Sequence, residues 1–265
     1  EARRLDPHRP SIRASGAWWD LQSGDEHEYH GSLTGPQSLY TDIYGRPEKL
    51  MTEFGVDAPA CLESLRQVPR LRQRLQPLAE SIGELQHYQY RLLKYQIEYL
   101  RIIKYRPCAG YFQFMFIDLC PQSFYGVCDW WGLPKEGLQA LTESGQPLGI
   151  FMEHREGPVA LWAVNDLARA FPGCTAAWTA VDGEGHLVAE GSAALDLPAD
   201  GAVRVGDLAF PAPPEAIRRV TLTLHDAAGA LLARNVYRDP FRHPPHPRGH
   251  PQRMSHELGV RLWWA

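Results

Sequence analysis

The sequence predicts a mixed fold, in which an α/β segment with a parallel sheet is followed by an all-β sandwich of the immunoglobulin type. Over residues 1–145, strand-like and helix-like stretches alternate, which is typical of βα units around a parallel sheet. From residue 146 to about 240, turn signals separate short alternating strands about every eight to twelve residues, which is typical of a sandwich. Residues 241–265 are rich in Pro and His and are expected to form an extended tail.

The composition excludes several classes of protein. The chain has 265 residues, 44% of them hydrophobic, which is enough for one large core or two ordinary ones. The net charge is −4 and the basic residues are scattered, so neither nucleic acid nor a membrane is expected as a partner. The five cysteines include no CxxC pair, which argues against a disulfide framework and a thiolate zinc site, and no metal or other cofactor is expected. Nothing in the sequence indicates a cellular compartment.

The first segment contains four predicted strands. The last of them is apolar almost throughout, as strands buried on both faces tend to be. The four strands are RPSIRASGA at 9–17, DEHEYHG at 25–31, KLMTEFG at 49–55 and GYFQFMFIDL at 110–119. A fragment with so few parallel strands would leave two sheet edges unpaired, so further strands are expected from elsewhere in the polypeptide.

The strongest helix signal covers about residues 81–105, where apolar and aromatic side chains recur at spacings of three and four. Its aromatic members, which we expect in the core, are Tyr88, Tyr95 and Tyr99. Glu98 and Arg101 stand three residues apart, which predicts an ion pair on the helix surface. Arg106-Pro107 is expected to end the helix.

The second segment is expected to contain about seven strands. Asp182-Gly183 and Asp226 with Gly229 mark two of its hairpin turns. Stretches of this kind include PVALWAVND at 158–166, CTAAWTAVDGEGHLVAEG at 174–191, AVRVGDLAF at 202–210 and RRVTLTLHDAAGALLARNVY at 218–237.

Polar side chains gather where the predicted strands of the first segment end. They are Asp25, His27, Tyr29, His30, Glu53 and Asp118. The carboxyl ends of parallel strands form the active-site face of α/β barrels, so these side chains are candidates for one site. A single acid before Phe54-Gly55 is by itself more typical of a capping or solvated residue, and composition alone does not decide between the two interpretations.

Several motifs, in the same order along the chain, resemble glycoside hydrolase family 2 and are nearest to its β-mannosidase-like branch. TEFGVDAP at 52–59 is similar to the strand-7 run that carries the family's catalytic nucleophile. LDPHRP at 5–10 resembles the turn into strand 5, and GDEHEYHG at 24–31 resembles strand 6. GYFQFMFIDLCP at 110–121 and GVCDWWGLPKEG at 126–137 resemble strand 8 and the segment after it. The similarity spans residues 1 to about 240.

The resemblance implies that residues 1–145 form the C-terminal half of a (β/α)8 TIM barrel, strands 5–8, and that 146–240 form the family's immunoglobulin-like β-sandwich. It also implies a retaining exo-β-glycosidase that acts on an oligosaccharide or another β-glycoside, with Glu53 as the nucleophile. In this family the acid/base Glu follows an Asn at the end of strand 4, and this chain contains no Asn-Glu pair. The acid/base is therefore expected in an N-terminal remainder of the same polypeptide, and the chain alone is expected to be inactive.

The resemblance also assigns substrate-binding roles to the other candidates. It places Asp25, His27 and His30 near the −1 sugar subsite, which Tyr29 would line, although these polar groups could equally do no more than hold the loop together. Asp118 would be the second acid of the family's usual Asn-Asp pair, with Ile117 in place of the Asn.

Trp130 is expected either to stack on a sugar ring or to pack against the sandwich. Three within-class activities remain open besides β-mannosidase, namely exo-β-glucosaminidase, β-galactosidase and β-glucuronidase. A non-catalytic carbohydrate-binding or scaffold protein is the alternative from another class. Ile117, together with Phe112 or Phe114 where the family usually has Trp, favours the scaffold, whereas the intact TEFG run favours the enzyme.

Overall fold

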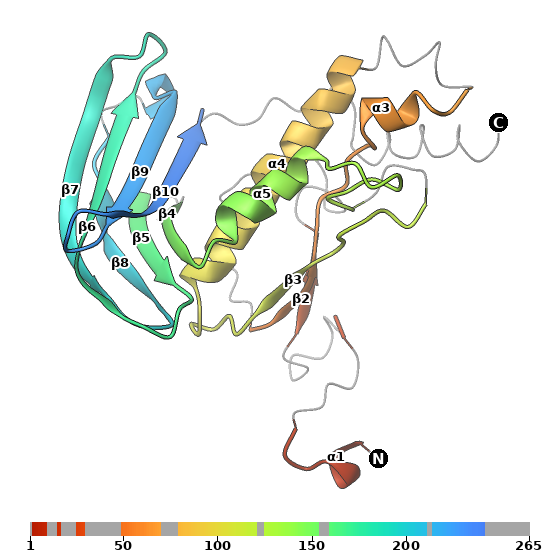
Figure 1. Ribbon diagram of the computed structural model, residues 1–265, viewed down its shortest axis with the longest axis horizontal. Helices are drawn as coiled ribbons and strands as arrows, with labels where there is room; N and C mark the ends of the chain where they lie inside the picture. The colour runs from red at the N-terminus through yellow and green to blue at the C-terminus, as the bar shows by residue number, and fades with distance from the viewer. Residues whose placement is uncertain are drawn as a thin grey trace.

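The structure is a computed structural model that describes residues 2–9, 15–16, 25–29, 49–69, 79–120, 125–153, 159–210 and 214–241. A long helix, α4 (Ala79–Ile102), lies between a small parallel sheet and a two-sheet β-sandwich (Figure 1). A short helix, α1 (Ala2–Leu5), lies apart near the N-terminus. No described helix has both the length and the apolar content required to cross a membrane.

The parallel sheet contains three strands in the order β1-β2-β3, which is also their order along the chain. They are β1 (Glu26–Glu28), β2 (Met51–Phe54) and β3 (Tyr111–Gln113). His27 lies opposite Glu53 across the β1–β2 pair. Three of the four predicted strands are therefore observed in the expected parallel arrangement, whereas most of the predicted strand at 9–17 lies outside the described residues.

The strand predicted at 110–119 is shorter than its apolar run. Phe114 still donates its backbone N–H to the Phe54 carbonyl, and the chain then leaves the sheet. Met115 exchanges backbone hydrogen bonds with the segment that begins at Tyr125, and Ile117 forms an isolated bridge with Cys128. Apolar content identified a buried segment here, but the backbone partners of Met115 set the end of the strand.

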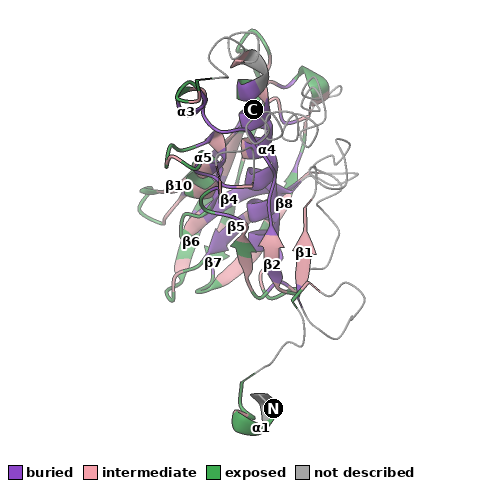
Figure 2. Ribbon diagram, turned by 90° about the vertical axis from the view of Figure 1, so that its right-hand side faces the viewer, coloured by how far each residue is buried: buried purple, intermediate pink, exposed green. Residues whose placement is uncertain are grey.

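Helix α4 is buried along most of its length (Figure 2), and every residue from 91 to 100 is buried. One side packs on the parallel sheet, while α5 (Glu136–Ser144) and the sandwich cover much of the rest (Figure 1). Gly137 allows α5 to approach closely, since a Cβ there would lie 2.5 Å from Gln89 Oε1. The predicted tyrosines belong to the core, as expected. A further helix, α3 (Leu62–Leu65), follows the segment after β2.

The predicted surface pair between Glu98 and Arg101 is wrong. The side chain of Glu98 is 0% exposed and forms an ion pair with Lys94, in which Lys94 Nζ lies 2.8 Å from Glu98 Oε1. Arg101 instead donates to the Ser144 carbonyl and to the carboxylate of Asp166. Helical spacing correctly placed polar residues together, but their face meets the sandwich instead of solvent.

The second segment is a two-sheet sandwich in which all strand pairs are antiparallel. One sheet has the order β10-β9-β6-β7 and the other the order β4-β5-β8. The strands are β4 (Leu148–Glu153), β5 (Val159–Asn165), β6 (Phe171–Val181), β7 (Leu187–Leu197), β8 (Gly201–Leu208), β9 (Arg219–His225) and β10 (Leu231–Arg238). A short 3₁₀ turn, η2 (Pro214–Ala216), precedes β9. Seven strands match the expected number.

The two predicted hairpins end in turns that an aspartate stabilises. Asp182 Oδ1 accepts the backbone N–H groups of Glu184 and His186 between β6 and β7. Asp226 does the same for Ala228 and Ala230 between β9 and β10. Most buried apolar side chains of both segments belong to one contiguous core, which includes Met51 of β2 and Tyr237 of β10.

Candidate active site

Glu53 lies near the carboxyl end of β2, the central strand of the parallel sheet. Met51 and Phe54 of this strand are buried in the core, while Thr52 and Glu53 are half-buried. The Glu53 side chain is 33% exposed, so it can both be held and be reached. Gly55 follows directly, and a Cβ there would lie 2.1 Å from the carbonyl oxygen of Phe114. Only glycine therefore allows the backbones after β2 and β3 to approach this closely.

Two side chains from the β1 segment converge on one oxygen of Glu53. The Tyr29 hydroxyl donates a hydrogen bond of 2.6 Å to Oε2, and His27 Nδ1 lies 3.3 Å from the same atom. The His27 contact follows from strand register, because His27 is the direct neighbour of Glu53. Burial and the adjacent Glu53 carboxylate raise the pKa of Tyr29 far above its usual value, so the phenol keeps its proton and remains a donor.

Aromatic contacts fix the ring of Tyr29. Its centroid lies 4.9 Å from that of Tyr125, and it meets Phe114 edge-on at 6.3 Å. Tyr125 and Phe114 both come from the segments that leave β3, so the end of the third strand supports the hydroxyl that contacts the second. This packing restricts the direction from which the Tyr29 hydroxyl approaches Glu53.

Asp25 is buried behind the two residues that contact Glu53. Its Oδ2 accepts hydrogen bonds from the Ser15 hydroxyl at 2.7 Å, the Gly16 backbone N–H at 2.9 Å and the Thr52 hydroxyl at 2.9 Å. Ser15 Oγ in turn lies 3.1 Å from His27 Nε2. A continuous polar chain therefore runs from Asp25 through Ser15 and His27 to Glu53, and it orients the His27 ring from both nitrogens.

Sequence reasoning missed Ser15 and Thr52. Thr52 directly precedes Glu53, and Ser15 lies ten residues before Asp25. A hydroxyl side chain beside a catalytic-type acid is too common a feature to be informative on its own. The alternation of strand side chains places Thr52 on the face opposite Glu53, so the strand pattern gives no signal for its contact with Asp25 either.

Asp118 makes no hydrogen bond or ion pair with the Glu53 cluster among the described residues. Its carboxylate lies 2.6 Å from Lys135 Nζ, both side chains are 0% exposed, and it also accepts the Gly126 backbone N–H at 2.8 Å. Burial raises the pKa of Asp118 and lowers that of Lys135, and in each case the partner opposes the shift. Lys135 Nζ donates to the Ala58 carbonyl as well, so this pair connects the segment after β2 with the one after β3.

For the remaining candidates, Trp130 and His30, the described residues show no contact with Glu53. Trp130 is 49% exposed, whereas its neighbour Trp131 packs on a small apolar cluster around Leu65. His30 lies outside the described residues. One group of described side chains has the spacing of a metal site, Asp182, Glu184 and His186, and it lies in the β6–β7 turn of the sandwich. The substrate-binding roles expected for Asp118, Trp130 and His30 stay predictions.

Comparison with known proteins provides independent information on the fold. Residues 157–243 match the family described as a mannosidase Ig/CBM-like domain. The crystal structure of a β-D-mannosidase from Dictyoglomus thermophilum superimposes with a TM-score of 0.73 at 19% identity over 91% of this chain. The exo-chitosanase CsxA of Amycolatopsis orientalis matches 58% of this chain with a TM-score of 0.51, also at 19% identity. A search of curated proteins finds no match.

These matches cover only part of each relative. The chain corresponds to 34% of the length of the mannosidase and to 18% of that of the exo-chitosanase. At this level of identity the structural likeness concerns the fold. Together with the matched domain, it confirms the resemblance to glycoside hydrolase family 2 that the sequence motifs indicated.

Proposed function

We propose that this chain, a relative of glycoside hydrolase family 2, carries the nucleophile of a retaining exo-β-glycosidase of the β-mannosidase type, and that Glu53 is this nucleophile. The observation that supports the proposal most strongly is the position of Glu53. It lies at the carboxyl end of a central parallel strand, and Tyr29 and His27 both contact one of its oxygens. A carboxylate that attacks a sugar must be ionised and precisely oriented, and these contacts serve both requirements.

The reaction would proceed by double displacement. A Glu53 oxygen attacks the anomeric carbon while a second carboxylic acid gives its proton to the departing glycosidic oxygen, which leaves a glycosyl-enzyme ester. The second group, now a carboxylate, then takes a proton from water as that water attacks the anomeric carbon, and Glu53 is released. Tyr29 remains a hydrogen-bond donor throughout and holds Oε2, so that the other carboxylate oxygen is directed toward the sugar.

The acid/base would come from the N-terminal remainder of the same polypeptide. In retaining enzymes its carboxyl group lies about 5–5.5 Å from the nucleophile. Within the full protein we assign residues 1–145 to the second half of a (β/α)8 barrel, 146–240 to the immunoglobulin-like sandwich and 241–265 to a C-terminal tail.

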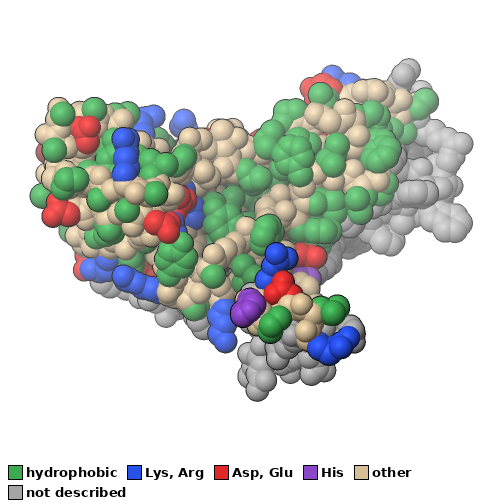
Figure 3. All heavy atoms as spheres, turned by 60° about the horizontal axis from the view of Figure 1, so that its bottom comes forward, with side chains coloured by type: hydrophobic (Ala, Val, Ile, Leu, Met, Phe, Trp, Pro, Cys, Tyr) green, Lys and Arg blue, Asp and Glu red, His purple; other side chains and the backbone are tan. Residues whose placement is uncertain are grey.

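Exposed apolar side chains support a larger assembly around the parallel sheet. Phe112, Phe116 and Leu119, on and after the edge strand β3, are 63%, 63% and 68% exposed. Hydrophobic side chains are prominent at the end of the molecule opposite the sandwich (Figure 3). An edge strand with apolar neighbours is suited to pair with further barrel strands.

The substrate would be an oligosaccharide or another β-glycoside with the sugar to be removed at its non-reducing end. A β-mannoside is the first choice because the mannosidase matches 91% of this chain, whereas the exo-chitosanase matches 58%. A β-glucosaminide is the second, since an exo-chitosanase shares part of the fold. β-Galactosides and β-glucuronides remain within-class alternatives.

A non-catalytic carbohydrate-binding or scaffold protein is the competing proposal. It is favoured by the environment of Asp118, whose carboxylate is engaged by Lys135 in the interior, and by Ile117, which is 45% exposed and has no polar group to offer a sugar.

The deciding experiment traps the covalent intermediate. The full-length protein is incubated with a 2-deoxy-2-fluoro-β-mannosyl fluoride and mapped by peptide mass spectrometry. We expect one adduct, on the peptide that contains Glu53, and none in Glu53→Gln. Glu63→Gln, at an exposed glutamate of α3, is the matched control and should label as the wild type does. An adduct on another carboxylate overturns the assignment, and sugar binding without any adduct supports the scaffold instead.

A further inference from the structure

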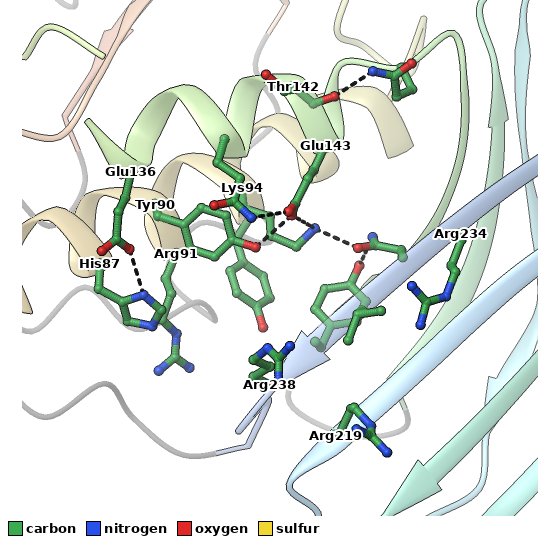
Figure 4. A pocket seen from close by; sticks show the side chains of 16 residues that line it. His87, Tyr90, Arg91, Lys94, Glu136, Thr142, Glu143, Arg219, Arg234 and Arg238 are labelled. Atoms are coloured by element: carbon green, nitrogen blue, oxygen red, sulfur yellow. Dashed lines mark hydrogen bonds and ion pairs between the residues drawn. The ribbon is translucent and has the colours of Figure 1, made fainter. Parts of the chain in front are cut away.

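A polar cleft of about 640 Å³ lies between the helix pair α4/α5 and the strands β9 and β10 of the sandwich (Figure 4). No residue of the Glu53 cluster lines it. Its volume falls within the range of about 300–1,000 Å³ that is usual for ligand sites. It is therefore a separate candidate site, and its side chains indicate which ligand it would take.

Positive charge predominates in this cleft although the whole chain has a net charge of −4. Its basic residues outnumber its acidic ones, Glu136 and Glu143. The Lys and Arg residues that line it are Arg91, Lys94, Arg219, Arg234 and Arg238. A cleft with one predominant sign of charge concentrates ligands of the opposite sign.

Both acids of the cleft already have partners. Glu136 Oε2 lies 3.0 Å from His87 Nδ1. Glu143 accepts hydrogen bonds from Tyr90 and Gln139 and lies 3.6 Å from Lys94 Nζ. Neither acid forms an ion pair with an arginine on the opposite wall, so the charge of that wall is not neutralised from within the cleft.

The opposite wall consists of Arg219, Arg234 and Arg238, which we call the arginine wall. Arg219 and Arg238 are direct neighbours in the β9–β10 pair, and Arg234 precedes Arg238 by four residues and therefore lies on the same face. Like charges directly opposite each other destabilise a sheet. None of these side chains has a hydrogen bond or ion pair within the described part of the chain, whereas the adjacent Arg218 pairs with Asp239 at 2.6 Å.

We infer that this cleft binds an acidic oligosaccharide, a sugar chain that carries carboxylate or sulfate groups. Guanidinium groups bind such oxyanions with paired hydrogen bonds. Four residues along a strand span about 13 Å, so Arg234 and Arg238 are suited to two charges on one chain, and a single phosphate is too small to contact both. The site lies outside the Glu53 cluster and is independent of the function proposed for it.

The remaining lining favours a sugar over other polyanions. Gln139 and Gln146 donate their amide N–H groups within the protein, to Glu143 and to the Thr142 carbonyl, and present their amide oxygens as acceptors for sugar hydroxyls. The rings of His87 and Tyr90 lie stacked with centroids 5.7 Å apart. Lys94 lies at the floor, where Glu98 compensates its charge, so the arginine wall is the part of the cleft that attracts an anion. A nucleic acid would require a longer basic surface than this one cleft provides.

Calorimetry on the full-length protein tests the inference, with a short oligogalacturonate as the probe. We expect binding that weakens with added salt, and a loss of at least about tenfold in Arg234→Gln/Arg238→Gln, since each charge-assisted hydrogen bond contributes at least that factor. Arg169→Gln/Arg204→Gln removes the same charge from the sandwich outside the cleft and should bind as the wild type does. Hydrolysis of a small aryl glycoside should be unchanged in both double variants.

Other probes distinguish the alternatives. Tighter binding of inorganic phosphate, of single-stranded DNA or of a neutral manno-oligosaccharide than of the oligogalacturonate would overturn the inference, as would an equal loss in both double variants or no binding at all. Arg219→Gln without ligand provides a second measurement, because removal of one of two opposed charges should raise the melting temperature. A lower melting temperature would show that the arginine wall is already neutralised in the free protein.

Discussion

Asn235, on the edge strand β10 of the sandwich, donates a hydrogen bond of 2.8 Å to Glu98 in α4, across 137 residues of sequence. The other oxygen of Glu98 accepts the Tyr237 hydroxyl at 2.7 Å, and Lys94 Nζ lies 2.8 Å from Glu98 Oε1. All four residues are buried. The contact between α4 and the sandwich thus contains a buried polar network, in addition to the ion pairs that Arg101 and Lys104 form with Asp166.

This network predicts a large effect of Glu98→Ala. The substitution leaves the buried ammonium group of Lys94 with only the more distant carboxylate of Glu143, 3.6 Å away, which should lower the free energy of unfolding by up to about 3–5 kcal/mol. Urea denaturation measures the change. The double variant Lys94→Met/Glu98→Leu removes both charges, so its free energy of unfolding should fall by less than that of Glu98→Ala. Equal losses in the two variants would mean that Lys94 reaches solvent once Glu98 is gone.

Glu143 predicts how stability depends on pH. Although its burial opposes this, hydrogen bonds from Gln139 and Tyr90 and the charge of Lys94 lower the pKa of Glu143. Its contribution to stability is then complete above the unfolded pKa of about 4.3 and is lost as the pH falls through the lower folded value. At pH 7 the free energy of unfolding of the wild type should exceed that of Glu143→Gln by at most about 1 kcal/mol, because the Glu143 side chain is partly exposed. Urea denaturation should show this difference shrinking below about pH 4.3, and a difference independent of pH would contradict the assignment.

Tyr29→Phe tests the hydroxyl that holds Glu53. A hydrogen bond to a charged group contributes about 1.5–3 kcal/mol, so kcat/KM of the full-length enzyme on an aryl β-mannoside should fall by about 10- to 100-fold. Tyr105→Phe is the matched control, since it removes a tyrosine hydroxyl that donates to Asp200 far from the site. A decrease of the same size in the control would remove the link between the Tyr29 hydroxyl and catalysis.

Gly55→Ala tests the close approach behind the nucleophile. A methyl group at 2.1 Å from the Phe114 carbonyl forces the backbone apart and should cost about 1–3 kcal/mol of stability, together with activity. Gly83→Ala, in α4, meets no atom within 4 Å and should stabilise the protein by up to about 1 kcal/mol. Thermal unfolding and activity measured on both variants separate a local clash from the general effect of an added methyl group.

The convergence of Tyr29, His27 and Asp25 near Glu53 could be anticipated from the sequence, because parallel strands bring their carboxyl ends to one edge. The hydroxyl groups of Ser15 and Thr52 could not, since nothing in their spacing distinguishes them from solvated side chains. The same limit applies to Glu98. Helical periodicity shows which side chains share a face, but whether that face meets water or another sheet is decided by strands more than a hundred residues away.

The seven-stranded sandwich and the long helix were foreseen from alternation and from spacings of three and four. The end of β3 was not, because an apolar run continues past the point where Met115 changes its backbone partner. The environment of Asp118 was hidden for a related reason. Lys135 follows it at a distance in sequence that suggests no pairing, and the backbone hydrogen bonds from Asp118 to Cys128 and from Lys135 to Val127 bring the two charges together.

The burial of α4 along most of its length has a practical consequence for protein engineering. A recombinant sandwich that begins near residue 146 would expose Asn235 and Tyr237, which the helix normally covers, and would lack the anchors that Arg101 and Lys104 provide to Asp166. The sandwich is therefore not expected to be stable as a separate domain without α4. Grafting it onto another enzyme requires that the helix be transplanted with it, so that α4 marks the natural cut point for domain exchange.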